Sequence, residues 1–507
     1  MTMASTLTLR ELIGRAEVDR SGVAADAREL GTVVTGLSYD SRSVQPGHAF
    51  VAVRGEHADG VVFAGQAHER GAVAVFAEAE APAGRTIAWI RVPDARATLA
   101  ALAAAFYADP SHELLVLGVT GTNGKTTTTY LLEAMLEHAG VQCGRVGSVS
   151  YRIGNNDETA EQEATRTTPE APDLQALLRA MVERKCGACV MEVSSHALAL
   201  RRVDGVRFGA GVFTNLTRDH LDFHGDTEGY FLAKRRLFEM LPEAAPAVLN
   251  ADDPRGRSLV NLAGRPVTYA LDGTADVAPT RRALTLGGIE LDVRTPRGPL
   301  HLRSRLLGRG NAYNILAAVT TCVALDVPFR AIEEGIDAVE LVPGRMQVVS
   351  NDADDITVVV DFAHTDDALR GLLETARLLG TGRLITVFGC GGDRDSSKRP
   401  LMGALAARLS DLLILTSDNP RSENPDHILR EIELGLGDVP KTAWRSTVDR
   451  GEAIAEAIHG ARSGDLVVIA GKGHERYQVV GARRVPFDDG AVGRAALARR
   501  RSRSRVR

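Results

Sequence analysis

Apolar positions along the chain follow two patterns, and together they predict an α/β protein. Short, mostly apolar runs are typical of strands buried within a parallel sheet. Such runs lie at residues 114–120, 188–193, 210–213 and 247–249. The first is followed by apolar residues spaced three or four positions apart, which predict a helix ending near Gly140. An alanine-rich stretch at residues 95–107 predicts another helix, which stops before Asp109-Pro110-Ser111.

The last third of the chain alternates more regularly between the two patterns. We expect strands at residues 356–362, 384–388, 412–416 and 466–470. Helices are expected between successive strands, at residues 366–379, 400–409 and 425–434. This order predicts a Rossmann-like, doubly wound sheet, which binds ligands beyond the carboxyl ends of its strands.

The length of 507 residues suggests about three domains, since a domain typically has roughly 100–200 residues. Breaks near Pro110 and near Val342-Pro343-Gly344 divide the chain accordingly. We expect an N-terminal domain at residues 1–110, a central domain at 111–342 and a C-terminal domain at 343–498. The arginine- and serine-rich segment 499–507 is expected to be a disordered, solvated tail.

The charge of the chain argues against a nucleic-acid partner. Its formal net charge is −5, and six arginines lie in the last nine residues, so the remainder is near −11. The N-terminus lacks the apolar core of a secretory signal, and no apolar run is long enough to span a membrane. We therefore expect a cytoplasmic protein with no membrane partner. Cys186 and Cys189 form a CxxC without a second pair, which indicates two small residues before a buried strand better than a zinc or redox site.

A phosphate-binding loop is indicated at Gly121-Thr122-Asn123-Gly124-Lys125-Thr126, between a predicted strand and a predicted helix. Glycines let backbone N–H groups approach phosphates, the lysine reaches the β- and γ-phosphates, and the threonine hydroxyl can bind Mg²⁺. The general pattern of phosphate-binding loops has a glycine at the position where this chain has Val119. A competing dinucleotide fingerprint at residues 389–394 fails because Arg394 stands in place of its last glycine.

Nine motifs, in this order, resemble the Mur ligase family over almost the whole chain. They are GTNGKT (121–126), MEVSSHAL (191–198), TNLTRDHLDFHG (214–225), AKRRLF (233–238), VPGRM (342–346), DFAHT (361–365), GCGGDRD (389–395), DNPR (418–421) and GKGHE (471–475). The resemblance implies an N-terminal UDP-binding domain, a central P-loop ATPase domain and a C-terminal amino-acid-binding domain. It also implies ATP-dependent addition of meso-diaminopimelate to the D-Glu of UDP-MurNAc-L-Ala-D-Glu, through an acyl phosphate, in peptidoglycan synthesis.

The resemblance assigns the catalytic and nucleotide-binding residues. Catalytic roles are expected for Lys125, Lys234, His220 and Arg345. ATP-binding roles are expected for Gly121, Thr122, Asn123, Gly124, Lys125, Thr126, Thr127, Asn314, Arg345 and Asp361. Mg²⁺ ligands are expected at Thr126, Glu192, His220 and Lys234, the last as a carbamate. Arg345 and Asp361 lie at or beyond the second domain boundary, so domain closure is expected to deliver them to the nucleotide.

Two further groups of residues are expected to bind the substrates. The UDP-MurNAc-dipeptide is expected at Ser41, Glu56, His57, Ala58, Thr167, Thr168, Ser194 and Arg202. Diaminopimelate is expected at Arg394, Asp418, Asn419, Pro420, Arg421, Gly471 and Glu475. Diaminopimelate differs from lysine by a second carboxylate, and Arg421 could bind that group through a bidentate pair. Alternatively, Arg421 merely caps or pairs with the nearby Glu423.

Other functions stay open. The same ligation could use L-lysine or another diamino acid, or the chain could be a related ligase of the folylpolyglutamate or muramoyl-alanine type. A P-loop ATPase switch that binds a protein partner is a further alternative, which the polar clusters at the C-terminal strand ends disfavour. Departures from the family at Arg166, Leu200 and Gly310 bear on substrate contacts and not on the reaction. We expect a monomer.

Overall fold

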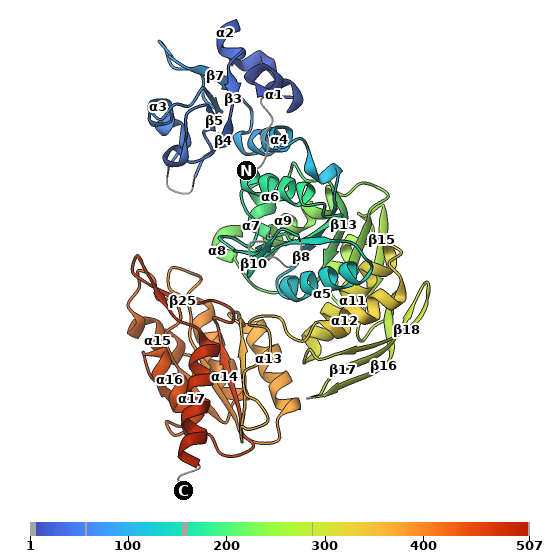
Figure 1. Cartoon of the computed structure of the whole chain (residues 1–507). Coiled ribbons are helices and arrows are strands. Elements are labelled where there is room, and N and C mark those ends of the chain that lie inside the picture. The colour runs from blue at the N-terminus through green and yellow to red at the C-terminus, as the bar shows by residue number, and fades with distance from the viewer. Residues whose placement is uncertain (1–6, 56–57, 155–160, 286, 505–507) are drawn as a thin grey trace.

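The computed structural model describes residues 7–55, 58–154, 161–285 and 287–504, so Glu56 and His57 lie outside the described residues. Three sheet-containing domains follow one another along the chain, with the central domain between the other two (Figure 1). No helix in the described ranges is long and apolar enough to cross a membrane.

The N-terminal domain is built on a five-stranded sheet in the order β2-β7-β6-β5-β4, parallel except for β2. Its strands are β2 (Val23–Ala24), β4 (Gly36–Ser38), β5 (His48–Val51), β6 (Ala74–Ala77) and β7 (Ala88–Arg91), with β1 (Leu7–Thr8) and β3 (Val33–Val34) pairing separately. Its helices are α1 (Leu9–Arg15), α2 (Ala27–Leu30), α3 (Ala64–Glu69) and α4 (Ala95–Phe106). The alanine-rich helix α4 matches its prediction because nearly all its small side chains are buried.

The central domain carries an eight-stranded sheet in the order β11-β10-β9-β12-β8-β13-β14-β15. Its strands are β8 (Leu115–Thr120), β9 (Cys143–Val146), β10 (Ser150–Arg152), β11 (Glu161–Glu163), β12 (Ala188–Glu192), β13 (Phe208–Phe213), β14 (Pro246–Asn250) and β15 (Arg265–Tyr269). All pair in parallel except β10 and β11 at one edge. The four predicted strands of this domain are therefore confirmed as buried parallel strands.

Helices cover both faces of the central sheet. One face packs against α5 (Lys125–His138), α11 (Arg309–Ala324) and α12 (Phe329–Ala338), and these in turn meet an antiparallel sheet. That sheet contains β16 (Ala278–Thr285), β17 (Gly288–Thr295) and β18 (Gly298–Ser304). The other face packs against α6 (Ala171–Glu183), α7 (Ser195–Ala199), α9 (Thr227–Glu239) and α10 (Pro254–Leu259), with α8 (Leu221–His224) preceding α9.

The C-terminal domain has a six-stranded sheet in the order β19-β20-β24-β21-β22-β23. Its strands are β19 (Gln347–Val348), β20 (Thr357–Asp361), β21 (Leu384–Phe388), β22 (Leu412–Leu415), β23 (Trp444–Ser446) and β24 (Leu466–Ala470), and a hairpin follows with β25 (Tyr477–Val480) and β26 (Arg483–Pro486). Helices α13 (Asp366–Leu379), α14 (Lys398–Leu409) and α15 (Pro425–Glu433) cover one face, and α16 (Arg450–Gly460) and α17 (Asp489–Ser504) cover the other. This confirms the predicted doubly wound sheet.

The arginine-rich tail differs from its prediction. Helix α17 continues through Ser504, so the expected disorder from Arg499 is wrong for the residues up to that point. Arg500 pairs with Asp355 at 2.7 Å, and Arg501 pairs with Asp354. These two carboxylates precede β20 and hold the last turns of the helix against the domain. Residues 505–507 lie outside the described part of the chain.

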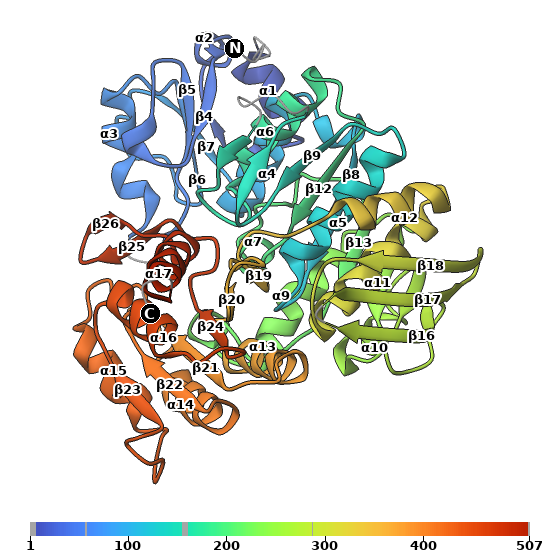
Figure 2. The same cartoon turned by 60° about the horizontal axis from the view of Figure 1, so that its bottom comes forward.

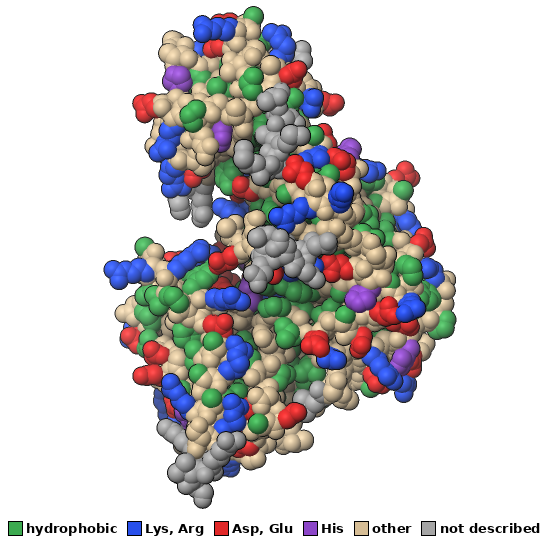
Figure 3. Space-filling model, viewed as in Figure 1, with side chains coloured by type: hydrophobic (Ala, Val, Ile, Leu, Met, Phe, Trp, Pro, Cys, Tyr) green, Lys and Arg blue, Asp and Glu red, His purple; other side chains and the backbone are tan. Residues whose placement is uncertain are grey.

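The carboxyl ends of the central and C-terminal sheets face a shared space. Figure 2 shows the edge of the C-terminal sheet with β19 and β20 turned toward the central domain. Figure 3 shows an indentation of the surface between the N-terminal and C-terminal domains, alongside the central domain.

The five cysteines are all buried and free, which agrees with the interpretation of Cys186 and Cys189 as packing residues.

A buried ion pair joins α16 to the start of α17. Arg450 donates through Nε and Nη2 to the two oxygens of Asp489, both at 2.7 Å, and both side chains are fully buried. Arg450 Nη2 also donates to the carbonyl of Ala470, the last residue of β24. The pair therefore fixes α17 beside a strand end that faces the candidate site.

We expect Asp489→Ala to destabilise the C-terminal domain by about 3–5 kcal/mol, because it leaves the buried Arg450 guanidinium without its counter-charge. Thermal unfolding followed by circular dichroism should show an earlier transition. Glu334→Ala, which removes the partner of the exposed Arg330, is the matched control and should leave the midpoint unchanged. An unchanged midpoint in Asp489→Ala would show that the pair is dispensable.

Candidate active site

The predicted phosphate loop lies between β8 and α5 and requires its glycines. Gly121 has a φ of +148°, and a Cβ atom there would lie 1.8 Å from Thr214 Oγ1. Gly124 has a φ of +89°, and a Cβ atom there would lie 2.2 Å from Asn314 Oδ1. Any larger residue would displace these neighbours, and the positive φ of Gly124 also favours glycine. The second contact places Asn314, at the start of α11, directly against the loop.

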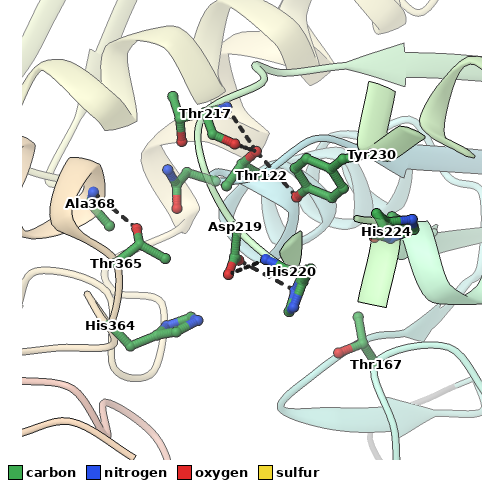
Figure 4. A network of polar contacts seen from close by, with 12 residues as sticks. Thr122, Thr167, Thr217, Asp219, His220, His224, Tyr230, His364, Thr365 and Ala368 are labelled. Atoms are coloured by element: carbon green, nitrogen blue, oxygen red, sulfur yellow. Dashed lines mark hydrogen bonds and ion pairs between the residues drawn. The ribbon is translucent and has the colours of Figure 1, made fainter. Parts of the chain in front are cut away.

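The TNLT segment after β13 holds the loop in place. The Thr122 N–H donates to the Asn215 carbonyl, and the Asn123 N–H donates to Asn215 Oδ1, both at 2.9 Å. Thr122 Oγ1 accepts hydrogen bonds from the Thr217 N–H at 3.0 Å and from the Tyr230 hydroxyl at 3.2 Å (Figure 4). The loop is thus preorganised by neighbouring segments of the same domain.

Lys125 begins α5 and turns back over the loop. Its Nζ donates to the carbonyls of Gly121 and Thr122, both at 2.9 Å. Burial lowers the pKa of Lys125, while Glu192 and Asp219 act in the opposite direction. A phosphate group at this loop would supply the anionic partner that the two carbonyls only partly replace. Thr127 is buried in the same first turn of α5.

Thr126 and Glu192 meet at the carboxyl ends of β8 and β12. Thr126 Oγ1 donates to Glu192 Oε1 at 3.0 Å, and both side chains are buried. The Ser148 N–H donates to Glu192 Oε1 at 2.8 Å, and Ser148 Oγ donates to Oε2 at 3.2 Å. A hydroxyl and a carboxylate oxygen in contact fit the hard ligands of Mg²⁺. The described residues contain no group of three or more His, Cys, Asp and Glu able to hold a metal, so phosphate or water would complete such a site.

His220 and Lys234, the other predicted metal ligands, lie nearby but face other partners. His220 Nε2 is 3.3 Å from Asp219 Oδ2, and burial lowers the pKa of His220 to about 3 (Figure 4). Lys234 Nζ donates to the Gly121 carbonyl at 2.8 Å and lies 4.5 Å from the Tyr230 ring centroid. Burial, reinforced by Lys125, lowers the pKa of Lys234 well below its usual value. Lys234 therefore touches the phosphate loop itself.

Arg345 brings the second domain boundary onto the phosphate loop. Its Nη2 donates to Thr126 Oγ1 at 3.1 Å, and its guanidinium lies 4.6 Å from the Phe362 ring centroid. Burial lowers the pKa of Arg345, although Asp361 and Glu192 oppose this shift. Asp361 accepts hydrogen bonds from the N–H groups of Met346 and Ala363 at 2.7 and 2.8 Å, so it shapes the turn that carries Arg345.

Four of the residues predicted to bind the muramoyl substrate come together beside Glu192. Thr168 Oγ1 donates to the Glu192 carbonyl at 2.8 Å and accepts from the Ser194 N–H at 3.1 Å. Thr167 shares a 3.0 Å contact with Ser148 Oγ, and Arg202 Nη1 donates to the Thr168 carbonyl. Ser41 lies in the N-terminal domain and donates to Gln66, apart from these four, and Ala58 is exposed.

The residues predicted for the amino acid gather at strand ends of the C-terminal sheet. Arg421 Nη1 donates to the Gly392 carbonyl at 2.6 Å, and Arg394 Nη1 donates to the Asp393 carbonyl at 3.0 Å. Burial and then Arg394 lower the pKa of Arg421, so the two guanidinium groups lie close enough to repel. Among the described residues neither arginine has a carboxylate within ion-pair distance.

The alternative pairing of Arg421 with Glu423 is wrong. Glu423 instead receives two hydrogen bonds at 2.8 Å from Arg399, a buried residue of α14. Pro420 faces Gly392, whose Cβ would lie 2.0 Å from the Pro420 carbonyl oxygen, and a Cβ at Gly471 would lie 2.6 Å from Asp418 Oδ2. The loops after β21, β22 and β24 are therefore packed tightly against one another, with Arg421 half-buried among them and Arg394 exposed.

Several residues of the site were not predicted. Lys472 is fully buried and donates to Glu475 at 2.7 Å and to Asn419 Oδ1 at 3.0 Å, while Asn419 Nδ2 donates to the same Glu475 oxygen at 2.9 Å. Glu475 is thus already paired. Lys472 and His474 belong to the GKGHE motif and could have been found from it. Ser148 and Arg399 carry no comparable signal, since only the tertiary fold brings them to the site.

Comparison with known proteins identifies the family. The Mur ligase family catalytic domain matches residues 33–107, the Mur ligase middle domain matches residues 119–322, and the Mur ligase glutamate ligase domain matches residues 344–473. The chain belongs to the Mur ligase family. This membership favours a ligase over the ATPase switch.

Named Mur ligases resemble the chain along nearly all its length. A UDP-N-acetylmuramoyl-L-alanyl-D-glutamate--2,6-diaminopimelate ligase of Gloeobacter violaceus is 48% identical over 98% of this chain and 99% of its own. The ligase of the same name from Geobacter metallireducens is 47% identical over 91% and 93%. A solved structure of a ligase with this name has a TM-score of 0.67 at 32% identity, covering 97% and 99%. The MurF ligase of Thermotoga maritima, solved with ADP, shares the fold with a TM-score of 0.61 at 19% identity, covering 92% and 98%.

We expect Lys125→Ala to lower ligase turnover by about a hundred-fold or more, because the loop loses the cation that would offset charge on the transferring phosphoryl group. ADP release in a coupled assay measures the effect. Lys441→Ala, which changes an exposed lysine against Trp444 on a distant surface, is the control and should keep full turnover. Wild-type turnover in Lys125→Ala would exclude this loop as the phosphate site.

Proposed function

We propose that this chain adds meso-diaminopimelate to the D-Glu of UDP-MurNAc-L-Ala-D-Glu, with conversion of ATP to ADP and phosphate, in peptidoglycan synthesis. The named relatives support the reaction. The observation that carries the choice of amino acid is the pair of arginines, Arg394 and Arg421, which face the same loops without a carboxylate partner among the described residues. An amino acid with two carboxylates matches two adjacent guanidinium groups.

The chemistry explains the arrangement of the site. A carboxylate is too weak an electrophile for an amine at neutral pH, so its oxygen first attacks the γ-phosphorus of ATP and releases ADP. The amine then attacks the acyl phosphate carbon, and phosphate leaves as the amide forms. Lys125 and Arg345 would offset the charge of the transferring group, and both already lie on the loop. Thr126 and Glu192 would hold Mg²⁺, which supplies further positive charge at the phosphates.

Lys234 is the proposed site of a carbamate. Its low pKa leaves more of the amine neutral at neutral pH, and the neutral amine is the form that adds to carbon dioxide. The reaction forms an N–C bond, releases one proton and turns a buried cation into a carboxylate-like group. Such a group beside His220 would complete a second Mg²⁺ site. We also propose that the protein works in the cytoplasm as a monomer.

L-Lysine is the second candidate for the added amino acid, and a panel of amino acids distinguishes the two. Measured as ADP release with UDP-MurNAc-L-Ala-D-Glu, meso-diaminopimelate should exceed L-lysine in kcat/KM by roughly one to nearly four orders of magnitude, because lysine leaves the half-buried Arg421 unpaired. Equal use of both, or preference for lysine, would contradict the assignment of the amino acid.

Arg421→Lys and Arg421→Ala should both lose this preference. Lysine keeps the charge but not the planar fork, so it separates bidentate recognition from charge alone. Arg430→Ala, on the exposed side of α15, is the matched control and should keep the preference. A preference that survives both substitutions at Arg421 would show that Arg421 does not bind the distal carboxylate.

Lys234→Ala should be nearly inactive and should recover part of its activity with excess formate or acetate, which can occupy the place of the carbamate. Lys234→Arg keeps a cation but cannot be carbamylated, so it should be equally inactive and should not be rescued. Activity of the unaltered protein should fall as pH decreases, because protonation of the amine opposes carbamate formation. A fully active Lys234→Ala variant would contradict the carbamate proposal.

A further inference from the structure

His474 of the GKGHE segment (471–475) contacts the central domain beside the phosphate loop. Its Nε2 lies 3.2 Å from the carbonyl oxygen of Ser148, which follows β9. A carbonyl only accepts, so Nε2 carries the proton and donates. The imidazole also packs on Phe362, with the ring centroids 5.1 Å apart. The contact therefore joins two segments 326 residues apart in the sequence.

Ser148 in turn contacts residues predicted to bind the nucleotide and the muramoyl substrate. Its N–H and Oγ both donate to the Glu192 carboxylate, the candidate Mg²⁺ ligand next to the nucleotide loop. Its Oγ also contacts Thr167, one of the predicted muramoyl-substrate residues, at 3.0 Å. A shift of Glu192 or Thr167 on ligand binding would consequently move the Ser148 carbonyl that accepts the hydrogen bond from His474.

His474 also belongs to the GKGHE segment (471–475), which forms part of the candidate amino-acid site. Lys472 and Glu475 flank it, and both take part in the hydrogen-bonded group with Asn419 of the DNPR loop. The backbone at Gly473 packs closely on Phe362, because a Cβ atom there would lie 2.7 Å from Phe362 Cβ. Movement of His474 is thus transmitted to Glu475 within one residue.

We propose that His474 is a positioning residue that couples binding of the amino acid to binding of the nucleotide and muramoyl substrate, through its hydrogen bond to the Ser148 carbonyl. This inference rests on the proposed function, because it takes the loop around Glu475 as the amino-acid site. Coupling is reciprocal: if the nucleotide favours the arrangement in which His474 reaches Ser148, the amino acid favours nucleotide binding by the same factor.

The coupling can be measured on the full chain by calorimetric titration with meso-diaminopimelate. One titration uses the protein alone, and the other adds Mg²⁺, a non-hydrolysable ATP analogue and UDP-MurNAc-L-Ala-D-Glu. For the unaltered protein we expect affinity for meso-diaminopimelate to rise on the order of tenfold in the second titration. In His474→Phe the ratio should fall to about one, since phenylalanine keeps the packing on Phe362 but has no donor.

His474→Gln, whose amide can donate to the same carbonyl, should restore part of the ratio, which a merely structural role would not predict. His427→Phe, an exposed position on α15, is the matched control and should leave the ratio unchanged. Circular dichroism of each variant checks that the fold is kept.

The two proposals fail in different ways. An undiminished ratio in His474→Phe, or a ratio of one in the unaltered protein, would overturn the coupling role and leave the ligase assignment standing. Absence of meso-diaminopimelate binding to the unaltered protein under both conditions would overturn the proposed amino acid, and the coupling inference with it.

Discussion

The carboxylate of Glu192, buried at the carboxyl end of β12, is the group on which the rest of the site depends. It accepts hydrogen bonds from Thr126 of the phosphate loop and from Ser148 after β9, and the carbonyl of the same residue accepts from Thr168. A buried carboxylate needs such donors, because its charge has lost its hydration. One side chain thereby sets the relative positions of a nucleotide loop, a substrate loop and the contact to the C-terminal domain.

Positive charge accumulates around this carboxylate. Lys125, Lys234 and Arg345 are drawn together at the loop, and burial lowers the pKa of each. A cluster of buried cations is unfavourable without anions to offset it. Binding of a polyphosphate would offset this electrostatic cost. The residues that destabilise the free protein would therefore add to its affinity for ATP. Asp219, which Figure 4 shows next to His220, raises the pKa of both Lys125 and Lys234, so its carboxylate partly compensates the positive charge.

Much of the fold could be predicted, because buried parallel strands have simple signatures. The strands at β21 and β24 and the helix at α13 begin and end at the expected residues. The antiparallel sheet of β16–β18 was not predicted, although alternation at Ile289, Leu291 and Val293 carries its signal. The motifs placed Lys125, Glu192, Arg345 and Arg421 at the site. They could not reveal Ser148 or Arg399, whose contacts arise only when distant segments pack together, nor that Lys472 already neutralises Glu475.

The turn that carries Arg345 can pack against the segment that carries His474 only because residue 344 has no β-carbon. Gly344 has a φ of +65°, and a Cβ atom there would lie 2.2 Å from the backbone nitrogen of His474. Its carbonyl accepts from the Phe362 N–H, so the same residue also fixes the ring beneath Arg345. Any side chain at this position would push the segment that carries His474 away from the turn that carries Arg345, so the two residues could no longer reach the central domain together.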